Sequence, residues 1–453
     1  MGVVVELRSK AAFGNISRGE RSTPPAGEID TALRELARRC WAWEALPLAR
    51  RVELLDEVIA GTAAVAPGWV ARECERKQLS WGSAVAGEEW WNGPWRALRA
   101  AHGLRAELTK RGQEDRARGR VRIATVHRND TVSSIPFIET IETLFGEGQV
   151  VLLQLSTRSL APVLDKALHP VIDEGFVRIV TGGPVTDSGS VTPVIVVPGD
   201  WSAADFARQA RAIATMLTHG GSYERGAVRL LVTDRGWRGR ERLLAALRRV
   251  LQGVPNRFAF HPGAHGRFAR FMQAHPEIEL LGAGHSGSLP WGLITNLDPC
   301  REDLAFTMDP FAPILSETSL QSSSIADFID GAVAFCNERV AGRLVATLIA
   351  DPRGSRDPST ATALERGTER LGYRMVTINL PPFVGLVYGH KGREAARHGK
   401  TVIRGAFRSI TTPPWLVTHS HSHDVFRRLA RYEVAPSTTQ LPAIIWHSIR
   451  GER

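Results

Sequence analysis

The feature that most constrains the fold of this chain is a regular alternation of apolar, strand-like segments with amphipathic, helix-like segments. In the first half the predicted strands are 121–127, 149–156 and 177–183, and the predicted helices are 133–148 and 161–176. Short connections between alternating elements favour a parallel sheet with right-handed crossovers. Because these strands are almost continuously apolar, we expect both faces of the sheet to be covered.

The alternation restarts near residue 190, which predicts a second α/β domain. Its strands are predicted at 192–200, 228–234 and 343–352, and its helices at 202–217, 238–253, 325–339 and 362–373. We therefore divide the chain into three parts. They are N-terminal helices with a first α/β domain (1–189), a second α/β domain (190–400), and a Pro-punctuated extension that packs back on the body (401–453).

The net charge of +10 raises the question of a nucleic-acid partner. The basic residues are spread along the chain instead of gathering in a patch, so no nucleic-acid partner is expected. No apolar run approaches the roughly 18 residues that span a bilayer. The N-terminus also lacks the pattern of a secretory signal, so we expect no membrane association and a cytoplasmic protein.

The four cysteines, Cys40, Cys74, Cys300 and Cys336, are scattered and form no Cys-x-x-Cys pair. This spacing argues against a disulfide framework and against a structural zinc site. We expect free thiols.

A series of short motifs runs through the alternation. They are Ile135-Pro136-Phe137, 149–157, Thr181-Gly182-Gly183, 187–193, 219–224 and 309–313. In this order they resemble the motifs of the aldehyde dehydrogenase superfamily, in the form of a divergent bacterial member. The resemblance covers about residues 120 to 380. It implies an α/β fold with a Rossmann-type nucleotide-binding domain, followed by a second α/β catalytic domain.

The resemblance also implies NAD or NADP as cofactor and a homodimer as the assembly. Gln154 stands where the family has a lysine that holds the cofactor ribose, and Asp309 stands where it has a ribose-binding glutamate. A glutamine can still donate a hydrogen bond to a ribose hydroxyl. The positions that the resemblance assigns to cofactor binding are Ile135, Pro136, Gln154, Ser156, Gly182, Gly183, Gly189, Asp309 and Phe311.

The most consequential departure from the family pattern is Glu224, which occupies the position of the nucleophilic cysteine. That reaction needs a group that attacks an aldehyde as a nucleophile and later leaves, as a thiolate does. A carboxylate adds to an aldehyde unfavourably, and the adduct reverts. We expect cysteine-dependent aldehyde oxidation to be lost.

Three further residues complete the predicted catalytic set. Asp187 aligns with the family's glutamate base, and Ser134 aligns with its oxyanion-hole asparagine. A serine hydroxyl can still donate a hydrogen bond to an oxyanion. His219 lies five positions before Glu224 and is a candidate to join Asp187 and Glu224 in an acid/base group.

Three functions are consistent with this reading. The first is a repurposed enzyme that acts on a small carbonyl substrate by carboxylate acid/base chemistry, in secondary metabolism. The second is a non-catalytic scaffold or partner subunit that uses the fold for association. The third is an NAD(P)-dependent oxidoreductase that works without a covalent intermediate.

His419, His421 and His423 would share one face of an extended strand, where imidazoles can bind zinc, nickel or copper. Neighbouring same-face positions on one strand are strained as ligands of a single ion. We therefore interpret the segment as a polar exposed loop and predict no metal site.

Overall fold

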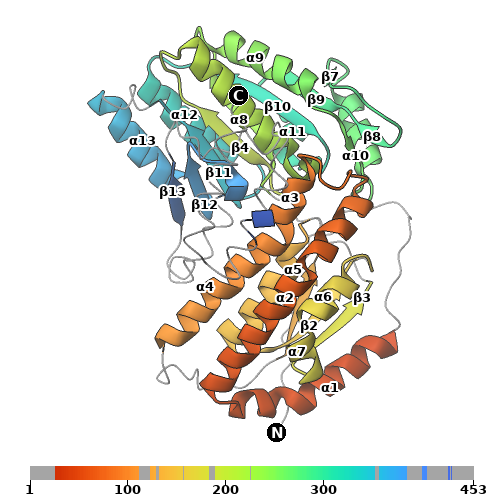
Figure 1. Ribbon diagram of the computed structural model, residues 1–453. Coiled ribbons are helices and arrows are strands. Elements are labelled where there is room, and N and C mark those ends of the chain that lie inside the picture. The colour runs from red at the N-terminus through yellow and green to blue at the C-terminus, as the bar shows by residue number, and fades with distance from the viewer. Residues whose placement is uncertain are drawn as a thin grey trace. The chain divides into compact units, whose positions relative to one another are not determined.

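The computed structural model describes residues 26–111, 123–128, 132–156, 158–182, 189–224, 226–351, 357–384, 400–405, 427–428 and 430. The chain forms two compact units (Figure 1). Unit 1 comprises residues 1–188 and 419–453, and unit 2 comprises residues 189–418.

Unit 1 contains a three-stranded parallel sheet in the order β1-β2-β3. Its strands are β1 (Ile123–Arg128), β2 (Val150–Leu155) and β3 (Val177–Thr181). All six residues of β2 are buried, as expected for a central strand covered on both faces. The helices of this unit are α1 (Ala26–Ala45), α2 (Leu48–Arg76), α3 (Ala86–Trp90), α4 (Arg96–Arg111), α5 (Ser134–Ile141), α6 (Ala161–Ala167) and α7 (His169–Asp173). There are also two π-helical turns: Trp91–Trp95 joins α3 to α4, and Glu142–Gly146 continues α5.

The helix predicted at 161–176 is divided into α6 and α7. Pro170 lies in the first turn of α7 and has no N–H to continue the hydrogen bonding of α6. The prediction of a single helix over this segment was therefore wrong.

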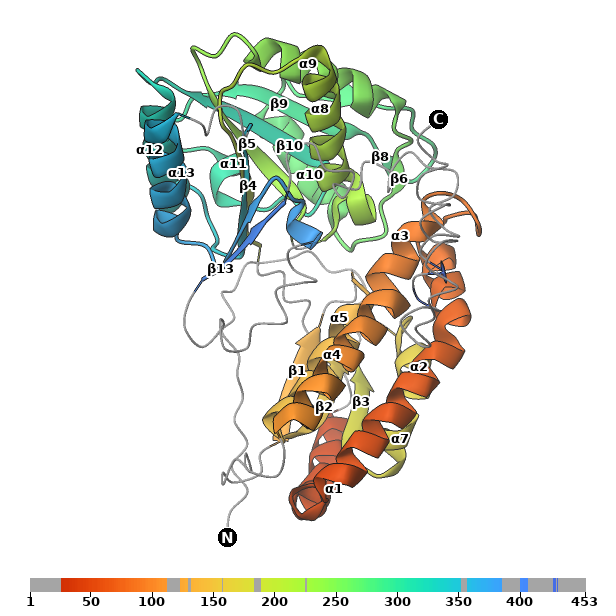
Figure 2. The ribbon, with the colours of Figure 1, turned by 60° about the vertical axis from the view of Figure 1, so that its left-hand side comes forward.

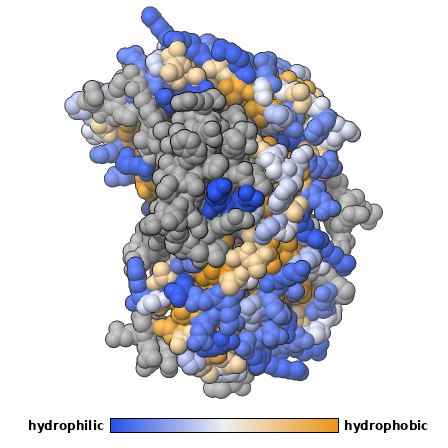
Figure 3. All heavy atoms as spheres, in the orientation of Figure 1, coloured by the Kyte–Doolittle hydropathy of each residue, from blue (hydrophilic) through white to orange (hydrophobic). Residues whose placement is uncertain are grey.

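In the described part of the chain, α2 is the one helix long and apolar enough to cross a membrane by length and composition. Core helices pass the same test, and α2 buries Leu54, Leu55, Val58 and Trp69 within unit 1. The end of unit 1 that holds α1 and the start of α2 presents mainly hydrophilic atoms on the face shown in Figure 3.

Unit 2 is built on an eight-stranded sheet in the order β13-β12-β11-β4-β5-β10-β9-β7. Every pairing is parallel except that of β7 with β9. The strands are β4 (Thr192–Val196), β5 (Val228–Asp234), β7 (Glu279–Leu281), β9 (Trp291–Leu297), β10 (Ile314–Leu320), β11 (Val345–Ile349), β12 (Met375–Ile378) and β13 (Thr401–Arg404). A separate antiparallel pair consists of β6 (Arg257–Phe258) and β8 (Ser288–Leu289).

Helices cover both faces of this sheet, as Figure 2 shows. Helices α8 (Ala203–Thr218) and α9 (Arg240–Gly253) pack on one face, over a core that includes Val194, Val196 and Leu231. Helices α12 (Ile325–Glu338) and α13 (Pro358–Arg370) pack on the other face, over Ile195 and Val232. Two short helices, α10 (Ala264–Ala274) and α11 (Leu304–Thr307), complete the unit. The predicted alternation of strands and helices is confirmed in both units.

Candidate functional site

Glu224 lies just after α8, in a turn that precedes β5. After α8 ends, Gly220, Gly221 and Ser222 all have left-handed backbone conformations, with φ of 60°, 68° and 72°. Three consecutive residues of this kind reverse the chain within a short span. Left-handed glycine is easily tolerated, but the same conformation at Ser222 stores strain, which tends to occur at functional sites.

This turn brings Glu224 against His219. Oε1 of Glu224 lies 3.2 Å from Nε2 of His219, and the two side chains are 5% and 1% exposed. The imidazole of His219 stacks on the ring of Phe383, with 4.2 Å between centroids. The stacking fixes the plane of the imidazole. The structure therefore brings together two of the four predicted catalytic residues.

Gly220 is what allows the carboxylate to lie so close to the turn. A Cβ atom at this position would sit 2.9 Å from Cγ of Glu224 and 3.4 Å from its Oε1. Any side chain at residue 220 would displace Glu224 from His219.

The other two predicted catalytic residues are not in this pair. Ser134 is the first residue of α5 in unit 1, is fully buried, and its hydroxyl has no hydrogen-bond partner within the described residues. Asp187 lies outside the described residues, as do Gly183, His419, His421 and His423. No cluster of three potential metal ligands occurs among the residues that are described.

The predicted ribose-binding residue of unit 2, Asp309, makes a buried ion pair. Its Oδ1 accepts from Nε of Arg229 at 2.8 Å and from the backbone N–H of Phe311 at 2.9 Å. Burial raises the pKa of the Asp309 carboxyl, while the Arg229 guanidinium and the Phe311 N–H counteract that rise. Gly189, also predicted at the cofactor site, lies against it, since a Cβ there would be 2.9 Å from Cβ of Asp309.

Arg229 was not predicted from the sequence, and it organises this part of unit 2. Besides Asp309, its guanidinium donates to the hydroxyl and carbonyl oxygens of Ser222, at 2.5 Å and 2.6 Å, and to the carbonyl of Ala312 at 3.1 Å. Arg229 thus ties the strained turn before Glu224 to the 309–312 segment. A lone arginine inside the apolar strand 228–234 was the available sequence signal, because a buried charge must be paired.

Phe311, the last predicted cofactor residue of unit 2, has a φ of 36° and belongs to an aromatic stack. Its ring faces His261 with 5.4 Å between centroids, and His261 in turn faces Tyr223 at 5.6 Å. Tyr223 immediately precedes Glu224. The stack is a second connection between the 309–312 segment and the turn.

In unit 1 the predicted cofactor residues lie at the carboxyl ends of the strands or at the start of α5. Gln154, near the end of β2, donates from its side-chain amide to the carbonyl of Gly182 at 2.7 Å. The N–H of Gly182 in turn donates to the carbonyl of Leu155 at 2.8 Å. Ser156 follows β2, and Ile135 and Pro136 lie in the first turn of α5. One N–H of the Gln154 amide thus bonds to the protein's own backbone.

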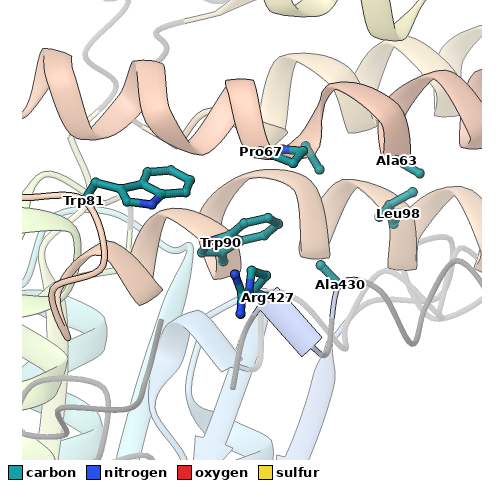
Figure 4. Close-up of a pocket in the computed structure, with 8 residues that line it drawn as sticks. Ala63, Pro67, Trp81, Trp90, Leu98, Arg427 and Ala430 are labelled. Atoms are coloured by element: carbon teal, nitrogen blue, oxygen red, sulfur yellow. The ribbon is translucent and has the colours of Figure 1, made fainter. Parts of the chain in front are cut away.

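Unit 1 also holds a cavity of about 170 Å³ beside α2 (Figure 4). The described residues that line it are Ala63, Ala66, Pro67, Trp81, Trp90, Leu98, Arg427 and Ala430. None of the predicted catalytic or cofactor residues is in this set.

No known family model and no curated protein matches this sequence. Among solved structures, the chain is similar to an NADP-dependent glyceraldehyde-3-phosphate dehydrogenase from Bacillus halodurans C-125 in complex with NADP. That match has a TM-score of 0.58 and 12% identity, and it covers 78% of this chain and 82% of the other. Aldehyde dehydrogenase 21 from Physcomitrella patens, in complex with succinate, gives a TM-score of 0.61 at 13% identity over 79% and 83% of the two chains.

A salicylaldehyde dehydrogenase from Pseudomonas putida G7 gives a TM-score of 0.61 at 11% identity, over 79% of this chain and 86% of the other. These likenesses show that the chain has the fold of the aldehyde dehydrogenases. The predicted fold class, a Rossmann-type α/β domain followed by a second α/β domain, is confirmed.

Proposed function

We propose that this protein is an enzyme with the aldehyde dehydrogenase fold that acts on a small carbonyl compound by acid/base chemistry at Glu224 and His219. The observation that carries the proposal is the buried contact of 3.2 Å between these two side chains, held by a strained turn. A carboxylate and an imidazole in contact can pass a proton between them and a substrate.

The four cysteines support a route without a thiolate. Cys40, Cys74 and Cys336 are buried, and burial raises the pKa of each thiol, to about 12 for Cys74 and Cys336. Cys300 is exposed and lies in the loop after β9. A buried thiol with a raised pKa is a poor nucleophile at neutral pH.

In the proposed reaction, the carboxylate of Glu224 accepts a proton from the carbon next to the substrate carbonyl. The electron pair of the broken C–H bond forms the C=C bond of the enolate. The proton on the carboxyl exchanges with solvent, and the carboxyl then returns a proton to the same carbon. His219, in contact with Glu224 at 3.2 Å, holds the orientation of the carboxylate and takes part in its proton exchange. Neither step changes the oxidation state of the substrate, so no hydride acceptor is needed.

The test is exchange of α-hydrogens for solvent deuterium, followed by NMR over a panel of small aldehydes and ketones. We expect Glu224→Gln to lower the exchange rate at least 100-fold, within the range typical of general acid–base catalysis. Glu302→Gln is the matched control, because Glu302 is an exposed carboxylate of the same unit. Full exchange by a folded Glu224→Gln variant would refute the assignment.

A second candidate is a non-catalytic partner subunit. It is favoured by the protein contacts that both predicted ribose-binding side chains make, Gln154 with Gly182 and Asp309 with Arg229. This candidate predicts no exchange by the wild-type protein and a stable complex with another enzyme. The predicted cytoplasmic location and homodimer belong to either candidate, and light scattering after size-exclusion chromatography tests the dimer.

A further inference from the structure

The three-stranded sheet of unit 1 has the connectivity of one mononucleotide-binding half. The chain runs from β1 through α5 to β2, and from β2 through α6 and α7 to β3, with all strands parallel. A doubly wound dinucleotide-binding fold contains two such halves. The dinucleotide lies across the point where the strand order reverses between them.

The chain leaves no room for the second half after β3. Strand β3 ends at Thr181 and β4 begins at Thr192, so residues 182–191 are the whole connection. A crossover between two parallel strands of one sheet takes a dozen residues or more, and a second half needs two crossovers and three strands. Moreover, β4 pairs with β5 and β11 in the sheet of unit 2, not with any strand of unit 1.

The described residues of unit 1 do not supply it elsewhere. Among the described residues, unit 1 has three strands, all in this one sheet.

At the end of β2, part of the hydrogen-bonding capacity is taken up by the protein itself. The amide of Gln154 donates to Gly182, and the N–H of Gly182 is already bonded to Leu155. We infer that unit 1 recognises at most one nucleotide and does not hold NAD or NADP as a dinucleotide. The nicotinamide half of NAD or NADP then adds nothing to the binding affinity that the adenylate half has by itself. This inference does not depend on the chemistry proposed for Glu224.

The test is calorimetric titration of the full chain with NAD+, NADP+, AMP and nicotinamide mononucleotide. An NAD-dependent dehydrogenase with a complete doubly wound fold serves as the positive control. We expect NAD+ and NADP+ to bind within threefold of the tighter mononucleotide, or none of the four to bind. A dinucleotide that binds more than tenfold tighter than both mononucleotides would overturn the inference. So would a change in reduced-nicotinamide absorbance during turnover.

The deuterium-exchange assay uses no nucleotide, so its failure and the failure of this inference are distinguishable.

Discussion

Arg229 and Asp309 form an ion pair at 2.8 Å in which the two side chains are only 1% and 3% exposed. Removing one partner from such a pair leaves an uncompensated buried charge. We expect Asp309→Ala to lower the free energy of unfolding by about 3–5 kcal/mol. Urea denaturation of the variant would measure the loss.

The double variant Arg229→Met/Asp309→Leu tests whether the stability loss in Asp309→Ala comes from the unpaired charge of Arg229. If the cost of Asp309→Ala comes from the orphaned guanidinium, replacing both partners with apolar groups should restore much of the stability. A loss below about 1 kcal/mol in Asp309→Ala would contradict the buried-pair interpretation.

Gly220 is the residue on which the position of Glu224 depends. Its φ of +60° disfavours any side chain, and a Cβ would sit 2.9 Å from Cγ of Glu224. We expect Gly220→Ala to cost about 1–3 kcal/mol of stability. It should also reduce deuterium exchange, because the carboxylate must move away from His219.

Gly331→Ala is the matched control for that substitution. Gly331 is exposed within α12, and a Cβ there would meet nothing within 4 Å. This variant should gain roughly 0.5–1 kcal/mol, since alanine favours a helix interior over glycine. Equal effects at the two glycines would argue against the close approach of Glu224.

The alternation of apolar strands and amphipathic helices was enough to predict both α/β units, but not the complete sheet of unit 2. Strand β10 (Ile314–Leu320) was missed because its buried residues include Ser316, Glu317 and Thr318. Glu317 is stabilised there by the guanidinium of Arg240, at 2.8 Å and 2.9 Å. A strand that buries a paired charge does not show the continuous apolar pattern that predicts a buried strand.

The site was predictable only where neighbours in sequence meet. His219 and Glu224 are five residues apart, so their contact follows from one local turn. Arg229 and Asp309 are far apart in sequence, and only the parallel arrangement of β5 and β10 brings their segments together. The sequence pattern also did not predict the number of strands in unit 1, because three apolar strands are equally consistent with the start of a longer sheet.

The four thiols should differ sharply in reactivity. Cys300 is exposed, whereas Cys40, Cys74 and Cys336 are buried with raised pKa values. Reaction with a disulfide reagent at pH 7 should therefore modify one thiol rapidly in the native protein and all four after unfolding. Cys300→Ser should remove the fast phase and leave deuterium exchange unchanged. A fast phase that survives this substitution would show a second reactive thiol and weaken the proposal of thiol-independent chemistry.

The N-terminus of α13 gives a prediction about pH. The carboxylate of Asp357 accepts hydrogen bonds from the hydroxyls of Ser359 and Thr360 and from the N–H of Thr360. These bonds lower the pKa of Asp357 to about 2. A carboxyl whose pKa is lower in the folded state stabilises that state above its unfolded pKa of about 3.9. The stabilisation is lost as the pH falls through the folded pKa.

The melting temperature of the wild type should therefore exceed that of Asp357→Asn at pH 5. The difference should shrink between about pH 4 and pH 2, because asparagine still caps the helix but does not titrate. A difference that stays constant over this range would show that the charge of Asp357 contributes nothing to the cap.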